Sequence, residues 1–145
     1  MPPSCARKIS KLPRKRPDAM DDWIADTVQA FGERMGIEDL ALDEDQGLEL
    51  EMDAGECMGM QLLPDMPGYE MLVYWGKPLL FDPAAQLERA LRLVDGRQAL
   101  PWPAQAAVRK DMLIMTMRIP ARSFELPTLE DAVRQLEAMQ ADAAG

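Results

Sequence analysis

Histidine is absent from this 145-residue chain, and serine occurs only at Ser4, Ser10 and Ser123. Without an imidazole, the chain lacks the side chain that most often serves as general base, partner of a nucleophile or metal ligand. None of the serines lies in a Gly-x-Ser-x-Gly elbow, and no glycine-rich phosphate loop opens a predicted helix. We therefore expect no enzyme, no catalytic residue and no cofactor.

Cysteine and long apolar runs are also scarce. The two cysteines are Cys5 and Cys57, and we expect neither a disulfide between them nor a metal site, as is usual in a reducing compartment. No apolar run approaches the roughly 20 residues of a membrane helix, and the basic N-terminal segment has no apolar signal core. The sequence predicts a cytoplasmic protein without membrane insertion.

The acidic run Asp43, Glu44 and Asp45 invites a calcium interpretation. An EF-hand loop needs its glycine one position later than Gly47, and it needs a helix afterwards where this sequence predicts a strand. We therefore predict a solvated turn and no metal site.

Charge is divided unevenly along the chain. Residues 1–18 carry six basic side chains against one acidic one, a net charge of +5, whereas the rest carries −14. The N-terminal segment is also proline-rich and poor in bulky apolar residues, which predicts a disordered basic tail over residues 1–19. Because Met20 directly precedes the first periodic segment, an alternative is that residues 1–19 lie upstream of the native start.

After Met20 the apolar periodicity predicts one domain, residues 20–145, with elements in the order α-β-β-β-α-β-β-α. Asp82 before Pro83, and Thr128 with Asp131 after Pro127, are typical of helix starts. The expected elements are a helix from Asp21 to about Met35, strands at about 47–53, 56–63 and 69–75, a helix at 83–94, strands at about 106–109 and 112–119, and a helix at about 129–140. This order predicts an α+β fold, a two-layer sandwich in which helices cover a mainly antiparallel, twisted sheet.

Methionine is abundant, with twelve in the chain. Eight of them fall in or beside predicted strands: Met52, Met58, Met60, Met66, Met71, Met112, Met115 and Met117. One interpretation is core filling, and the other is a surface that repacks around different apolar partners. The strand at 112–119 is apolar on much of both faces, so a two-layer domain leaves one face unburied and implies a partner.

The stretch from Phe31 to Asp53 joins a helix end to an alternating strand through an acidic turn. Its pattern, F-G-x-x-x-G-I-x-x-L-x-L-D-E-D-x-G-L-x-L-x-M-D, resembles the opening of class I type III secretion chaperones of the Tir chaperone-like family. The resemblance spans roughly Asp21 to Gln140. It implies a bacterial cytoplasmic homodimer that binds the N-terminal segment of a secreted effector in extended form and keeps it soluble and export-competent.

The resemblance also implies which residues carry binding. The effector-binding positions would be Trp23, Ile24, Val28, Phe31, Leu48, Leu50, Met60, Leu62, Met71 and Val73. The dimer-interface positions would be Leu87, Leu91, Val94, Trp102 and Val108. The basic tail, the Pro101-Trp102-Pro103 segment and the methionine content depart from the family pattern.

Two other functions stay open at this point. One is a regulator of the same type that sequesters a transcription or secretion regulator, with the basic tail touching nucleic acid. The other is a small-ligand-binding αβ dimer. An acidic body repels phosphate backbones, so we expect no nucleic-acid partner for the domain itself.

Overall fold

The computed structural model describes residues 7–8, 22–64 and 69–145. Its elements are β1 (Arg7–Lys8), α1 (Asp22–Arg34), β2 (Gly47–Glu51), β3 (Cys57–Pro64), β4 (Tyr69–Pro78), α2 (Pro83–Leu93), β5 (Ala104–Arg109), β6 (Met112–Pro120) and α3 (Leu126–Ala144), with short 3-10 turns at Asp53–Gly55 and Ala121–Ser123. Residues 1–6 and 9–21 lie outside the description, so the expected boundary at residue 20 stays a prediction.

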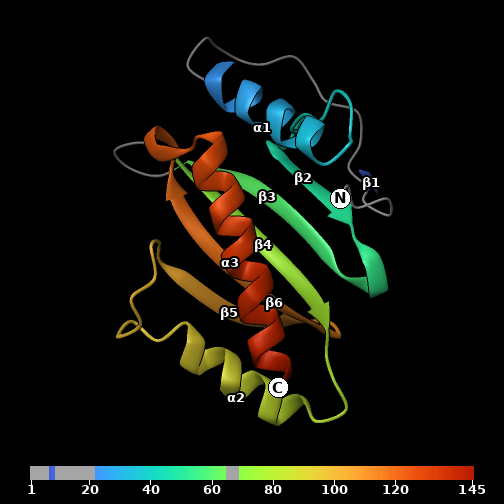
Figure 1. Ribbon diagram of the computed structural model, residues 1–145, viewed down its shortest axis with the longest axis vertical. Helices are drawn as coiled ribbons and strands as arrows, with labels where there is room; N and C mark the ends of the chain where they lie inside the picture. Colours follow the sequence, from blue (N-terminus) through green and yellow to red (C-terminus); the bar gives the residue numbers. More distant parts are fainter. Residues whose placement is uncertain (1–6, 9–21, 65–68) are drawn as a thin grey trace.

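The strands form one antiparallel sheet in the order β1-β2-β3-β4-β6-β5. Helix α3 crosses one face of this sheet diagonally, α1 lies near its β2 end, and α2 lies beside β5 and the end of α3 (Figure 1). The predicted α+β fold, with helices over an antiparallel sheet, is confirmed. The two-residue strand β1 differs from the disordered tail expected for residues 1–19.

The core lies between the helices and the inner face of the sheet. Alternate residues of each central strand point to that face, and the register places them opposite one another. The buried sheet residues are Leu48, Leu50, Met58, Met60, Leu62, Met71, Val73, Trp75, Leu113, Met115, Met117 and Ile119. Each large apolar side chain buried in this way stabilises the fold by about 1.5–3 kcal/mol.

Five of the eight methionines near strands are therefore core residues. Met58, Met60, Met71, Met115 and Met117 are at most 1% exposed, so the repacking-surface interpretation is wrong for them. Two others, Met52 and Met112, are half-buried, and Met66 lies outside the described residues.

Helix α1 packs its apolar stripe inward, as the periodicity predicts. Gly32 allows the following loop to approach this helix, because a Cβ there would lie 2.5 Å from the Cβ of Leu40. Gly36 has a φ of 81°, the left-handed conformation expected of a residue that closes a helix. Together these two glycines fold residues 36–40 back against α1.

Helix α3 starts earlier and ends later than the sequence predicts. It begins at Leu126 after Glu125, so the expected N-cap at Thr128 and its capping box with Asp131 are wrong. Pro127 lies in the first turn, where its missing N–H leaves no hydrogen bond unmade. At α2, by contrast, the Asp82 side chain accepts from the Ala85 N–H at 3.2 Å, which confirms the predicted cap.

The last turns of α3 are anchored to both neighbours. The buried Gln140 amide donates to the carbonyls of Trp75 and Leu113, both at 2.8 Å, and so ties α3 to β4 and β6. Arg89 of α2 donates to the carbonyls of Ala143 and Ala144 at 2.7 and 3.2 Å. An arginine in this position satisfies carbonyls that the helix end leaves without an intrahelical partner.

Across the described ranges, none of the helices combines the length and the apolarity needed to cross a membrane.

Candidate protein-binding surfaces

Large exposed apolar side chains concentrate on α2, the loop before it and β5. Phe81 is fully exposed, Leu91 is 53% exposed and Val108 is 45% exposed. Leu80 is exposed as well, and α2 contacts β5. We call these four residues the α2–β5 surface. Exposed apolar side chains clustered on neighbouring elements are typical of protein–protein contact sites.

Strand β5 adds a backbone feature to this surface. It pairs with β6 along one edge, and no described strand pairs with its other edge. An open edge presents unpaired N–H and C=O groups that another chain can bind. All five predicted interface positions retain exposure: Leu91 and Val108 are exposed, and Leu87, Val94 and Trp102 are half-buried.

Sequence reasoning missed Leu80 and Phe81 as surface residues. They follow Leu79 in a short apolar run between β4 and α2, next to the N-cap Asp82. A run of three apolar residues in a connecting segment was the available signal, because connections usually lie on the surface.

Nine of the ten predicted effector-binding residues belong to the core. Only Trp23, at the start of α1, is exposed, at 38%. The other nine are at most 6% exposed: Ile24, Val28, Phe31, Leu48, Leu50, Met60, Leu62, Met71 and Val73. In this structure those nine position α1 and the sheet, and Trp23 alone among the ten offers exposed apolar surface.

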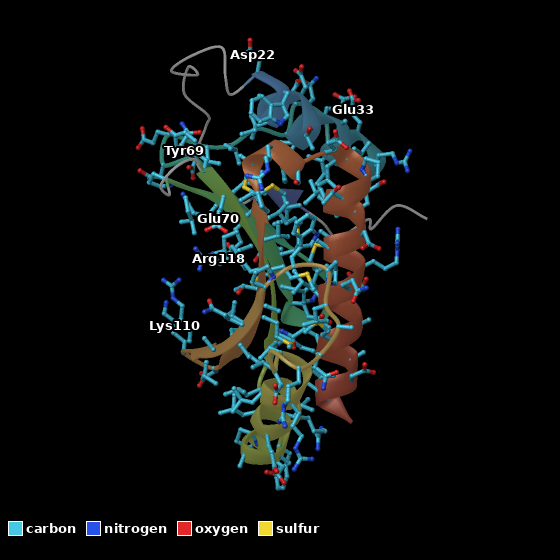
Figure 2. All side chains as sticks on the ribbon, turned by 90° about the vertical axis from the view of Figure 1, so that its left-hand side faces the viewer. Asp22, Glu33, Tyr69, Glu70, Lys110 and Arg118 are labelled. Atoms are coloured by element: carbon cyan, nitrogen blue, oxygen red, sulfur yellow. The ribbon has the colours of Figure 1, made fainter. Side chains whose placement is uncertain are left out.

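None of the described helices covers the outer face of the sheet, which carries both charged and apolar side chains (Figure 1). Glu70 of β4 and Arg118 of β6 form an ion pair there and point away from α3 (Figure 2). The side chains of Leu63, Leu72 and Ile114 are half-buried on this face. This face therefore combines one ion pair with half-buried apolar side chains.

Glycines let side chains lie flat on the outer face. Tyr74 crosses Gly59 and donates its hydroxyl hydrogen to Glu49 at 2.7 Å. A Cβ at Gly59 would overlap the Tyr74 ring and lie 2.6 Å from the Leu48 carbonyl oxygen. The contact therefore depends on a residue without a side chain at position 59.

Burial and the neighbouring Glu49 carboxylate raise the pKa of the Tyr74 hydroxyl far above its usual value. Burial, reinforced by Glu49, also raises the pKa of the Cys57 thiol. A thiol with a raised pKa is mostly protonated at neutral pH and reacts slowly, because the thiolate is the nucleophile. Cys57 has no other cysteine bonded to it and is half-buried.

The Tyr74 contact predicts a specific dependence of stability on pH. Because the folded state holds the phenolic proton more tightly than the unfolded chain, the contribution is complete below about pH 10, the ordinary tyrosine pKa. It is lost as the pH rises above that value, since the unfolded chain then releases the proton first. We expect Tyr74→Phe to make the free energy of unfolding fall less steeply between about pH 10 and 11, measured by urea denaturation. If the free energy of unfolding fell equally steeply with pH in the wild-type and Tyr74→Phe proteins, the raised pKa of Tyr74 would be contradicted.

The acidic run at residues 43–45 forms a turn. The Asp43 side chain accepts from the N–H groups of Asp45 and Gly47 at 2.9 and 3.0 Å. A carboxylate that bonds its own backbone in this way stabilises a turn. In the described part of the chain, no three metal-ligating side chains come together.

No protein-family model matches the sequence, and no curated protein matches it. Solved structures do match. A chain of the HopA1–SchA chaperone–effector complex aligns with a TM-score of 0.64 and 15% identity, covering 89% of this chain and 100% of that chain. A chain from the ExsC–ExsE complex aligns with a TM-score of 0.64 and 16% identity, covering 85% and 92%.

A third similar structure is the complex of the Yersinia pestis type III secretion chaperone SycH with a stable fragment of YscM2. A chain of this complex aligns with a TM-score of 0.61 and 15% identity, covering 81% of this chain and 96% of that chain. The alignments cover nearly the whole length of the matched chains, from 92% to 100%. The chain therefore has the fold of these matched chains over nearly their whole length.

Proposed function

We propose that this chain is a non-enzymatic type III secretion chaperone that acts as a homodimer in the bacterial cytoplasm. One observation carries the proposal: 89% of this chain aligns with all of a chain from a chaperone–effector complex. The exposed apolar side chains on one part of the fold support it. They support binding of another polypeptide, since such side chains on neighbouring elements are typical of protein–protein contact sites.

Two copies would pair through the α2–β5 surface, with Leu87, Val94 and Trp102 at its margin. Leu91 and Val108 lose their exposure when the same surface of a second copy covers them. The open edge of β5 offers backbone groups to the same contact. This proposal uses four of the six large apolar side chains that are exposed among the described residues.

The cargo would be an extended N-terminal segment of a secreted effector, bound near α1. Trp23 supplies exposed aromatic surface, and the nine core positions beneath it hold α1 and the sheet in place. Burial of apolar cargo side chains offsets the entropy lost on ordering the segment. The net charge of −9 favours a basic cargo segment and keeps the complex soluble.

The test is co-expression of the full chain with the N-terminal regions of secreted proteins encoded beside it. We expect one such region to stay soluble only with this chain and to co-purify as a complex of two chaperones and one cargo, measured by light scattering. The proposal would be contradicted if every N-terminal region were soluble without this chain. It would also be contradicted if this chain purified as a monomer that bound none of those regions.

The Trp23 contact has its own prediction. Trp23→Ala should reduce cargo affinity by about 1–3 kcal/mol, because aromatic anchors dominate protein interfaces. Tyr69→Ala is the matched control, since Tyr69 has nearly the same exposure, 39% against 38%, and lies on the side away from α3 (Figure 2). Titration calorimetry with a short soluble peptide of the cargo segment measures both variants. Equal affinities would exclude Trp23 from the cargo site.

A further inference from the structure

The loop before α2 holds an aromatic ring entirely in solvent. Phe81 is fully exposed, more so than any other large apolar side chain among the described residues, and Leu80 beside it is also exposed. Phenylalanine is among the side chains that gain most from burial. The domain alone obtains none of this gain from Phe81, so the ring is available to a partner.

Hydrogen bonds fix the backbone beside Phe81. The Leu79 N–H donates to the Asp111 carbonyl at 2.8 Å, which ties the loop to the hairpin between β5 and β6. The Leu80 N–H donates to Oε1 of Gln86 at 2.7 Å. The residue after Phe81 is the N-cap of α2. The ring is therefore held outward by a fixed backbone, and little loop entropy is lost when a partner covers it.

Gln86 is an unusual residue to find buried. Its side chain lies on α2 with no exposed surface, and its Oε1 accepts the Leu80 N–H. Its Nε2 has no hydrogen-bond partner among the described residues. A buried amide donor without a partner costs free energy that an apolar side chain of similar volume would not cost. Packing alone therefore does not account for Gln86, whereas its hydrogen bond to the loop does.

The α2–β5 surface has different side chains at its two ends. Phe81 and Leu80 lie just before α2, and β5 runs beside this helix (Figure 1). At the other end, in the connection from α2 to β5, the half-buried Trp102 lies between two exposed prolines. In a two-fold symmetric pair whose axis passes near the middle of α2, the start of each helix lies beside the end of the other. Such an axis brings Phe81 of each copy to the Trp102 end of the other.

The charges of α2 favour this antiparallel orientation. Asp82 and Glu88 are the exposed charges of the cap and the first half of the helix. Arg92 and Arg97 are the exposed charges of the last turn and the segment after it, and Asp95 between them is half-buried and pairs with Arg97. The Glu88–Arg92 ion pair within one helix can also form between two antiparallel helices. Parallel helices would instead bring like charges together. This complementarity identifies a second copy of the chain as the partner.

We propose that Phe81 of each copy packs against Trp102 of the partner subunit, and that Gln86 is the positioning residue that presents Phe81 for this contact. Aromatic side chains that enter a partner's apolar surface carry much of the affinity of an interface. The Gln86 amide acts through the Leu80 N–H and does not touch the partner. The inference rests on the homodimer of the proposed function and is independent of its cargo.

Sedimentation equilibrium of the full-length protein tests the contact. Because each substitution occurs in both copies, we expect Phe81→Ala to weaken dimer association at least about 100-fold. Trp102→Leu should weaken it at least about tenfold alone, but less than about twofold in the Phe81→Ala background. Phe81 is fully exposed in its own domain, so this coupling arises between copies. Trp23→Leu, at an exposed tryptophan of α1, is the matched control and should leave the dimer unchanged.

Gln86→Met tests the positioning role. Methionine keeps the side-chain volume but has no carbonyl oxygen for the Leu80 N–H. We expect it to weaken dimer association about tenfold in the wild-type chain and less than about twofold in the Phe81→Ala background. Hydrogen exchange of the Leu80 amide, measured in the Leu91→Glu background, should become at least about tenfold faster. Thermal unfolding checks the fold, and Gln86→Leu replaces Gln86→Met if the methionine variant does not fold.

A dimer that tolerated Phe81→Ala, or additive losses for Phe81→Ala and Trp102→Leu, would overturn the contact. Equal losses from Gln86→Met with and without Phe81, or unchanged exchange of the Leu80 amide, would overturn the positioning role. A wild-type monomer would overturn the proposed homodimer as well. Failure to retain cargo in the co-purification experiment would leave all of these measurements unaffected.

Discussion

Leu91→Glu is expected to convert the proposed homodimer into a 16.2 kDa monomer. Leu91 is the most exposed large apolar residue within α2, at 53%. In a two-fold symmetric interface the substitution places a carboxylate in both copies, so its effect is doubled. Burying each charge without a partner costs several kcal/mol, which exceeds the margin of a typical dimer at micromolar concentration. Light scattering over a range of protein concentrations measures the change.

Tyr69→Glu serves as the control for this experiment. Tyr69 is 39% exposed, and it belongs to neither α2 nor β5. A glutamate there should leave the mass of the assembly unchanged. If Leu91→Glu remained dimeric, or if the wild-type protein were a monomer at every concentration, the α2–β5 surface would not be the dimer contact.

Phe124→Ala is expected to lower the free energy of unfolding by about 3–5 kcal/mol. Phe124 is fully buried between the 3-10 turn that follows β6 and the start of α3, and it is the largest of the fully buried side chains. Its removal leaves a cavity that the surrounding strands and helices fill only partly. Urea denaturation followed by circular dichroism measures the loss.

Phe81→Ala provides a matched comparison, because it makes the same chemical change at a fully exposed position. Both variants are best compared in the Leu91→Glu background, so that assembly does not contribute to the unfolding free energy. We expect Phe81→Ala to change stability by less than about 0.5 kcal/mol. Similar losses for the two variants would mean that Phe124 is not part of a packed core.

Much of the fold could be predicted from local patterns. Alternation of apolar residues identified β2, β3, β4 and β6, and helical spacing identified all three helices. The predicted helix boundaries were less accurate where a residue is common at two different positions of a helix start. Pro127 can precede a helix or occupy its first turn, and packing of the flanking Leu126 and Phe124 against the core favours the second.

The binding residues were harder to predict for a physical reason. An apolar stripe such as Ile24, Val28 and Phe31 shows that one face of a helix is buried, but it does not show by what. Here the three residues are at most 4% exposed, because they pack into the core of the domain itself. The α2 stripe has the same pattern, yet Leu91 is left exposed because no described element covers it.

The contact between β1 and β2 could not be predicted from either segment alone. Two residues have no detectable periodicity, and the proline-rich composition around them favours disorder. Pairing depends on an edge that exists only after the sheet has formed, where Glu51 and Leu50 lie opposite Arg7 and Lys8.

The anchoring of α3 has a practical consequence for shortened versions of this protein. A stop codon after Met139 would remove the Gln140 amide, so the carbonyls of Trp75 and Leu113 would each lose a hydrogen bond. It would also remove the carbonyls of Ala143 and Ala144, to which Arg89 donates. The last residues of α3 thus stabilise the fold, and we expect a protein truncated before Gln140 to be insoluble.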